Sequence, residues 1–170
     1  GPTILDFFGL EIPKDMIGRP LREVIKDDTP HRDAALFGMF GGHVNVTNGR
    51  YTYMRAPETA NYPLNHYTLM PSHLRRPFST RELEKMTWSE PLPFSKKCPV
   101  MKIPSQGPVG QSPDTFETKL FDLENDPSQT ELIHNPLLEN RMIELMITVM
   151  QEHHAPNEQY IRLGLGNPNG

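Results

Sequence analysis

The stretch 43-HVNVTNGRYTYMR-55 decides the fold, because Asn48-Gly49 is a strong hairpin signal and alternating residues flank it on both sides. A two-residue turn at this pair predicts that Val46 faces Tyr51 across the hairpin. Side chains alternate along a strand, so this register gives one apolar face that we expect to be buried: Val44, Val46, Tyr51 and Tyr53. The other face is polar: His43, Asn45, Thr47, Arg50 and Thr52.

Further strands and one long helix are expected on either side of this hairpin. The run 34–40 is almost wholly apolar, which predicts a strand covered on both faces. Residues 61–70 and 119–123 are expected to be extended. Residues 136–153 have helical spacing of apolar side chains, with Asn135 as N-cap and Pro136 at the first helical position. Each buried apolar side chain contributes about 1.5–3 kcal/mol, enough to hold this helix on a small sheet.

The rest of the chain predicts short helices and long loops. A helix over 2–9 would end at Gly9, and 21–26 would form one or two helical turns. Ser79 and Glu82 have the spacing of a capping box, which predicts a short helix through about Met86. Residues 88–113 are rich in proline and are expected to be loop. The tail after Pro156 is expected to be extended along the surface.

Composition excludes several classes of function. A net charge of −4 without a basic face argues against nucleic-acid binding, and no apolar run approaches the roughly 20 residues that span a bilayer. Eighteen Pro and 12 Gly in 170 residues predict small folded units joined by long surface loops. The only cysteine, Cys98, allows no internal disulfide, which fits a cytoplasmic or a periplasmic bacterial protein. The abrupt start after Gly1 is expected to be an engineered truncation.

Three stretches in this order resemble one known family: 2-PTILDFFGLEIPKDMIGRPL-21, 49-GRYTYMR-55 and 119-KLFDLENDPSQTELIHNP-136. The first is similar to the segment that closes the large catalytic domain of the sulfatases, in the alkaline-phosphatase-like superfamily. The second is similar to the strand that begins the sheet of the smaller domain. The third is similar to the family's Leu-(Phe/Tyr)-Asp-Leu-x-x-Asp-Pro signature, which precedes the C-terminal helix.

The resemblance implies an α+β fold, with an antiparallel sheet of about four strands packed against a C-terminal helix and long Pro-rich loops. Residues 1–30 would be the tail end of the large domain and its connector, and 31–170 the C-terminal small domain. The implied partners are the missing N-terminal catalytic domain and a small sulfated substrate. Surface that lost this domain is expected to promote self-association.

The resemblance also implies chemistry that this chain lacks. Family members use a formylglycine made from a Cys/Ser-x-Pro-x-Arg motif, together with calcium held by Asp and Asn side chains. Cys98 is followed at once by Pro99 and no Arg completes the motif, so we expect no catalytic residue here and take Cys98 as a small buried side chain. Asp122, Glu124 and Asp126 are interpreted as acids of a turn rather than calcium ligands. The chain alone is expected to be inactive.

Two polar groups are candidates for substrate contact. His43, which follows two glycines, and Arg50 share the hairpin's polar face and could bind a sulfate. The favoured alternative is that His43 binds a backbone carbonyl between the domains. The second group lies in a long loop: His66, Tyr67, His73, Arg75 and Arg76. Here His66 and His73 could contact a sulfate or a sugar, while the alternatives are a solvated lid and, less favoured, a zinc site.

Three functions therefore remain for the intact protein. The leading hypothesis is a sulfuric ester hydrolase, to which this chain contributes one side of the substrate cleft. A phosphate or phosphonate ester hydrolase of the same superfamily would have a similar small domain. A stand-alone glycan- or protein-binding module would instead be a soluble, monodisperse chain with measurable affinity for its ligand.

Overall fold

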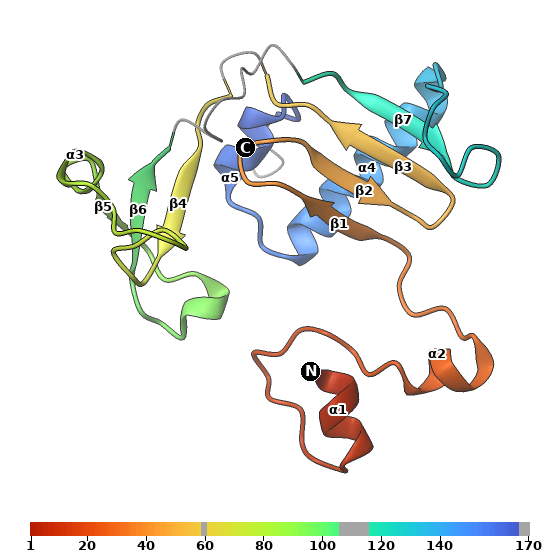
Figure 1. Ribbon diagram of the computed structural model, residues 1–170, viewed down its shortest axis with the longest axis horizontal. Coiled ribbons are helices and arrows are strands. Elements are labelled where there is room, and N and C mark those ends of the chain that lie inside the picture. Colours follow the sequence, from red (N-terminus) through yellow and green to blue (C-terminus); the bar gives the residue numbers. More distant parts are fainter. Residues whose placement is uncertain (59–60, 106–115, 167–170) are drawn as a thin grey trace. The chain divides into compact units, whose positions relative to one another are not determined.

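In the computed structural model the chain is an α+β protein, as predicted, but it has two antiparallel sheets where one was expected (Figure 1). The structure describes residues 1–58, 61–105 and 116–166. The chain divides into two units, Gly1–Asp33 and Ala34–Gly170. The assignment of the first unit to a larger catalytic domain stays a prediction. No helix within the described ranges has the length and apolar character needed to cross a membrane.

The first unit contains the two short helices that the sequence predicts, α1 (Pro2–Phe7) and α2 (Arg22–Asp27). Gly9 has φ +67°, which ends the first of them as expected. An ion pair of 2.7 Å between Arg22 Nε and Asp6 Oδ2 joins the two helices. None of the 33 residues of this unit is buried, and the side chains of Phe7 and Phe8 are 76% and 68% exposed. The unit therefore has no apolar core of its own.

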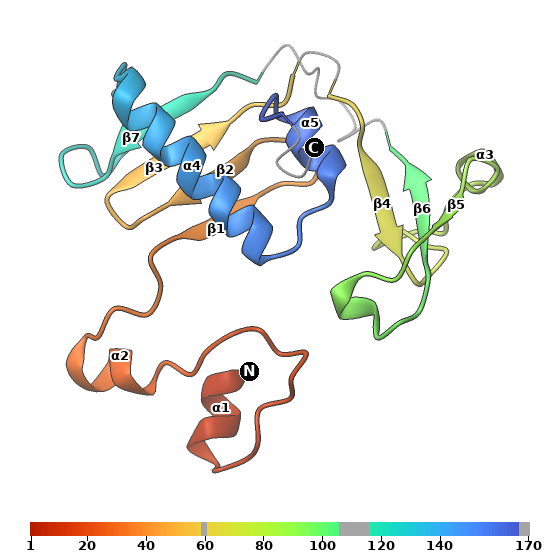
Figure 2. The same ribbon diagram turned by 180° about the vertical axis from the view of Figure 1, so that it is seen from behind.

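The second unit begins with a four-stranded antiparallel sheet in the order β1-β2-β3-β7. Its strands are β1 (Ala35–Gly38), β2 (Val44–Thr47), β3 (Tyr51–Arg55) and β7 (Lys119–Asp122). The helix α4 (Pro136–Glu152) lies across one face of this sheet (Figure 2). As predicted, Asn135 caps α4, because its Oδ1 accepts hydrogen bonds of 3.1 Å from the backbone N–H groups of Leu137 and Leu138.

The predicted register of the hairpin is wrong, because the turn lies one residue further along the chain than expected. Val46 pairs with Tyr53, and the turn is centred on Gly49 and Arg50 instead of Asn48 and Gly49. The side chain of Asn48 causes the shift, because its Oδ1 accepts hydrogen bonds from the backbone N–H groups of Arg50 and Tyr51 at 3.1 and 2.8 Å. Moving a turn by one residue shifts each partner by two, so the apolar face is still the predicted one. Val46 and Tyr53 are fully buried there.

The core lies between this face and α4. Its fully or nearly fully buried members are Val46, Tyr53, Leu120, Met142, Met146, Met150, Tyr160 and Leu163. The prediction that 34–40 is covered on both faces is wrong, because Phe37 and Phe40 are each 49% exposed. The reason is that β1 is an edge strand and α4 covers one face only.

The opposite face of the sheet carries a buried polar side chain. Asn45 is only 6% exposed, and its Oδ1 has no hydrogen-bond partner among the described residues. Register places Phe37 directly opposite it on β1. Asn45 also begins an Asn-x-Thr sequon, but a side chain so deeply buried does not accept a glycan in the folded state.

A second sheet of three strands lies where the sequence predicts mostly loop. Its order is β4-β6-β5, with β4 (Asn65–Thr68), β5 (Thr87–Ser89) and β6 (Val100–Pro104). The density of prolines argued against a strand here. Pro99 and Pro104 stand at the two ends of β6, however, where proline is tolerated, and Val100 and Ile103 are buried between them. A short 3-10 turn, Pro93–Ser95, precedes this strand. The remainder of the predicted loop, 106–113, lies outside the described residues.

Two further helices complete this unit. The helix α3 (Thr80–Leu83) begins with the predicted capping box of Ser79 and Glu82. The prediction of an extended tail is wrong, because α5 (Asn157–Arg162) is helical and carries Tyr160 into the core. The physical cause is apolar burial, since Tyr160 is 1% exposed and the following Leu163 is fully buried. Residues 167–170 of this tail lie outside the described residues.

Candidate functional site

The structure brings together only two of the four predicted substrate contacts. His43 lies just before β2, and its Nε2 is 2.8 Å from the backbone carbonyl oxygen of Glu117. Its ring also meets the ring of Phe116 edge-on, with the centroids 5.0 Å apart. His43 thus binds a backbone carbonyl, as the alternative interpretation expects, although this carbonyl belongs to the same unit.

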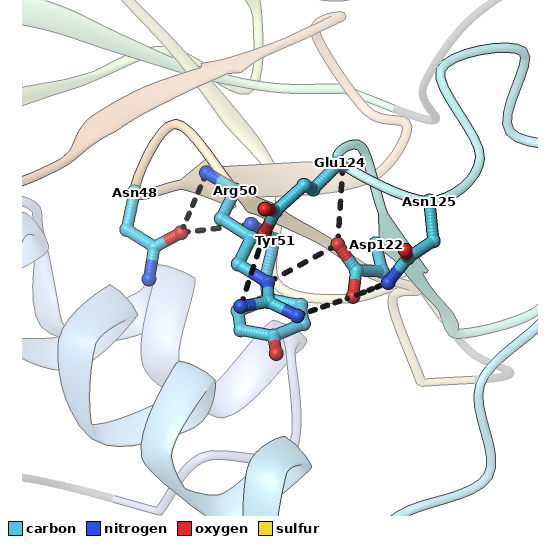
Figure 3. Close-up of polar contacts among 6 residues, drawn as sticks. All are labelled: Asn48, Arg50, Tyr51, Asp122, Glu124 and Asn125. Atoms are coloured by element: carbon cyan, nitrogen blue, oxygen red, sulfur yellow. Dashed lines mark hydrogen bonds and ion pairs between the residues drawn. The ribbon is translucent and has the colours of Figure 1, made fainter.

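Arg50, in the hairpin turn, is bound by two acidic side chains at the end of β7 and just after it (Figure 3). Its Nε and Nη2 donate to the two carboxylate oxygens of Asp122 at 3.2 and 3.0 Å, and its Nη1 lies 3.1 Å from Glu124 Oε2. The guanidinium carbon also lies 4.9 Å from the ring centroid of Tyr51. A sulfate would have to displace two carboxylates to bind this side chain. The structure therefore gives Arg50 a bracing role between β3 and β7.

The acids of the neighbouring turn are similarly engaged. Asp122 also accepts hydrogen bonds from the backbone N–H of Glu124 and from Asn125 Nδ2, at 3.1 and 2.9 Å. Asp126 Oδ2 accepts hydrogen bonds from the backbone N–H groups of Thr130 and Glu131 at 2.6 and 2.8 Å. The hydrogen bond from Arg50, followed by those from Asn125 and Glu124, lowers the pKa of Asp122, and the hydrogen bonds from Glu131 and Thr130 lower that of Asp126. The acids therefore cap a turn, as the sequence predicts.

His66 and His73 lie next to each other, with ring centroids 5.1 Å apart. His66 is the second residue of β4, and His73 follows in the loop that leads to α3. A hydrogen bond of 2.8 Å from the backbone N–H of His73 to the carbonyl of Arg76 closes a tight turn there. Phe78 is buried and contacts both imidazole rings. Its ring centroid lies 4.0 Å from that of His73 and 5.4 Å from that of His66.

Glu82 fixes the orientation of His73. Its Oε1 lies 2.8 Å from His73 Nε2, while its Oε2 accepts hydrogen bonds of 2.7 Å from the backbone N–H and the hydroxyl of Ser79. The hydrogen bonds from Ser79, followed by that from His73, lower the pKa of Glu82 to about 2. Glu82 is therefore ionised at neutral pH. Its contact with His73 Nε2 fixes the orientation of the imidazole ring. Arg76 Nη1 lies 3.8 Å from the same carboxylate.

His66 has a different environment. Its ring stacks on Phe40, with centroids 4.5 Å apart and an interplanar angle of 18°. Burial, and then the proximity of His73, lower the pKa of His66, so that its imidazole is neutral at pH 7. Among the described residues, neither ring nitrogen of His66 has a hydrogen-bond partner. A neutral, half-buried imidazole of this kind can donate one hydrogen bond and accept another from a ligand.

We call the group of Phe40, His66, His73, Phe78 and Glu82 the histidine cluster. Sequence reasoning found both histidines but missed the two phenylalanines and the role of Glu82. The capping box signalled Glu82, although the spacing gave no sign that its second oxygen would bind His73. The sequence grouped Tyr67 with these residues, because it follows His66 in the strand. Its ring is instead near Lys102, whose Nζ is 5.7 Å from the ring centroid.

No metal site is apparent in the part of the chain that the structure describes, where no three or more His, Cys, Asp or Glu side chains are grouped suitably. The residues present therefore do not fit the calcium site that the family resemblance implies. Cys98 is exposed, contrary to the expectation that it is buried. It lies in the segment between the 3-10 turn and β6, where its carbonyl accepts a hydrogen bond of 2.6 Å from the Ser95 hydroxyl.

Comparisons with known proteins support the fold. No protein-family model and no curated protein matches the chain. Among solved structures it is similar to a Bacteroides thetaiotaomicron sulfatase described with the metabolism of multiple glycosaminoglycans, with a TM-score of 0.52 and 15% sequence identity. The match covers 98% of this chain and 29% of that chain. The fold of this chain is therefore similar to a segment that makes up less than a third of that structure.

Proposed function

We propose that this chain is the C-terminal part of a sulfuric ester hydrolase, in which it completes the catalytic domain and lines the substrate cleft. One observation carries the proposal: the fold similarity extends over 98% of this chain but only 29% of the sulfatase it resembles. Most of such an enzyme would therefore lie outside these 170 residues. The first unit, with no buried residue, is consistent with a segment that packs on that missing part.

The histidine cluster is the proposed wall of the cleft. His43 and Arg50 are held by a backbone carbonyl and by two carboxylates, whereas the ring nitrogens of His66 have no partner among the described residues. His66 would donate a hydrogen bond to an oxygen of the sulfated substrate, and His73 would be kept in place by Glu82. The nucleophile and the calcium would belong to the larger domain, as the family resemblance implies.

The test is made on the full-length parent protein. Rates are measured with aryl sulfates and sulfated sugars, and in parallel with matched phosphate and phosphonate esters. We expect hydrolysis of the sulfate esters by the parent and none by the 170-residue chain. Preference for a phosphate or phosphonate would support the other hydrolase of the superfamily, and hydrolysis by the chain alone would contradict the proposal.

The role of the histidine cluster is tested in the same assay. Loss of one substrate hydrogen bond costs about 1–3 kcal/mol, so His66→Ala should lower kcat/KM by roughly 5–150-fold. His134→Ala, which changes an exposed histidine outside the cluster, is the matched control and should leave kcat/KM unchanged. Equal values for both variants would remove His66 from the substrate site. Glycan binding by a monodisperse isolated chain would instead favour a stand-alone module.

A further inference from the structure

The short helix α5 carries two buried charged side chains. Glu158 and Arg162 are 9% and 2% exposed, and they are four residues apart, so that they lie on the same side of the helix. Charged side chains are seldom buried to this degree unless they hold a defined partner. The contacts of these two show that each secures a different stretch of chain.

Arg162 holds the loop that follows Phe40. Its Nη1 donates to the carbonyl oxygen of Gly42 at 3.1 Å and to Asn61 Oδ1 at 3.0 Å. Asn61 extends this grip, because its Nδ2 donates to the carbonyl oxygen of Gly41 at 2.9 Å. The two carbonyls directly follow Phe40 in the chain.

This contact is made at an energetic cost. Among the described residues Arg162 has no acidic partner within ion-pair distance, and its third bond runs to a neutral amide oxygen, Gln159 Oε1, at 2.9 Å. Burial also lowers the pKa of the Arg162 guanidinium, because loss of solvent disfavours its charged form. A buried cation without an acidic partner is costly, and here hydrogen bonds to three neutral oxygens, that of Gly42 among them, offset part of the cost.

Glu158 holds the strand that carries His66. Its Oε1 accepts a hydrogen bond of 2.7 Å from Asn65 Nδ2, and its Oε2 lies 2.7 Å from Lys102 Nζ. Asn65 directly precedes His66 in β4, and Lys102 lies on the neighbouring strand β6. One carboxylate thus fixes both strands.

We propose that Glu158 and Arg162 are positioning residues, which hold the chain on either side of the Phe40–His66 stack and so set the aim of the His66 imidazole. Both stretches meet at that stack, where the two ring centroids are 4.5 Å apart. The inference rests on the proposed function only in taking His66 as a substrate contact. The positioning itself is a property of this chain and is measured without substrate.

The experiment follows the imidazole signals of His66 by NMR in the full 170-residue chain with labelled histidine. Stacking on Phe40 should shift the ring protons of His66 upfield, and the imidazole should titrate below the ordinary value of about 6.5. In Glu158→Ala and Arg162→Met we expect the upfield shift to be largely lost and the pKa of His66 to rise towards that value. His73 and Glu82, the titrating groups that affect His66, are unchanged in both variants.

Two further variants separate positioning from general loss of structure. Glu158→Gln keeps an oxygen for Asn65 Nδ2 and should retain most of the upfield shift. Ile161→Ala changes a side chain of α5 that is 52% exposed and should leave the spectrum of His66 unchanged. Should the two main variants fail to fold, Asn65→Ala removes only the bond to Glu158 and should still reduce the shift.

Two outcomes would overturn the inference. One is an unchanged His66 shift and titration in Asn65→Ala and in a folded Glu158→Ala. The other is the absence of close contacts between the Phe40 and His66 rings in the unmodified chain. Neither depends on sulfate hydrolysis by the parent, so failure of the proposed function is recognised separately. In an active parent, loss of positioning should lower kcat/KM in Glu158→Ala and leave it intact in Ile161→Ala.

Discussion

Arg50 and Asp122 join the hairpin to the last strand of the sheet through two parallel hydrogen bonds, Nε to Oδ1 at 3.2 Å and Nη2 to Oδ2 at 3.0 Å. Asp122 has two further donors in the turn that follows, whereas Arg50 is half exposed. We therefore expect Asp122→Ala to lower the urea midpoint of unfolding clearly more than Arg50→Ala. Arg141→Ala, an exposed change on α4, is the control. An Arg50→Ala effect equal to or larger than that of Asp122→Ala would contradict this account.

The fold was largely predictable because its decisive signals are local. Asn48-Gly49 marked the hairpin, and Asn135 with the apolar spacing behind it marked α4. The hairpin register was not predictable from the dipeptide alone, since the Asn48 side chain forms its own hydrogen bonds and moves the turn. The second sheet was missed because proline density outweighed a short apolar strand, and α5 because six residues give little periodicity.

The candidate site was predictable only in part. His66 and His73 could be recognised as polar residues in a long segment, but their surroundings come from distant parts of the chain. Phe40 precedes His66 by 26 residues and reaches it from the loop between β1 and β2. The charges on α5 that fix this arrangement follow almost a hundred residues after His66, at a range where sequence spacing carries no information.

The pKa of Glu82 predicts how α3 responds to acid. Its folded-state value of about 2 lies below the ordinary 4.5, so the ionised carboxylate stabilises the folded state fully above about pH 4.5. That contribution is lost as the pH falls from about 4.5 to about 2. We expect the amide signals of α3 and His73 to remain native at pH 4 and to change below it. In Glu82→Gln this pH dependence should disappear, and a Glu82 titration near 4.5 would contradict the capping geometry.

Among the described residues Asn45 Oδ1 has no hydrogen-bond partner, which predicts a stabilising substitution. A buried carbonyl without a partner costs about 1–3 kcal/mol, and valine suits a strand better than asparagine. Asn45→Val should therefore raise the free energy of unfolding of the 170-residue chain by about 1 kcal/mol, measured by urea denaturation. Lower stability would show that the oxygen has a partner in solution. In the parent, the gain should vanish if the larger domain supplies a donor to this face.

Exposed aromatic side chains of the first unit predict self-association. Phe7 and Phe8 are 76% and 68% exposed, and neighbouring exposed aromatic side chains favour association with another apolar surface. The 170-residue chain should sediment as a mixture of species at micromolar concentration, and the double change Phe7→Ser and Phe8→Ser should shift it towards monomer. Lys14→Ser, an exposed polar change in the same unit, should have no effect. A monomeric starting chain would contradict the prediction.

The burial of Asn45 bears on the choice of expression host. In a eukaryotic secretory pathway a glycan is attached to Asn-x-Thr while the chain is still unfolded, and a sugar on this asparagine could not enter the closed sheet. Each glycosylated molecule would be trapped before its second strand pairs. The fraction of chains with a glycan at Asn45 would thus report how many were glycosylated before the hairpin formed.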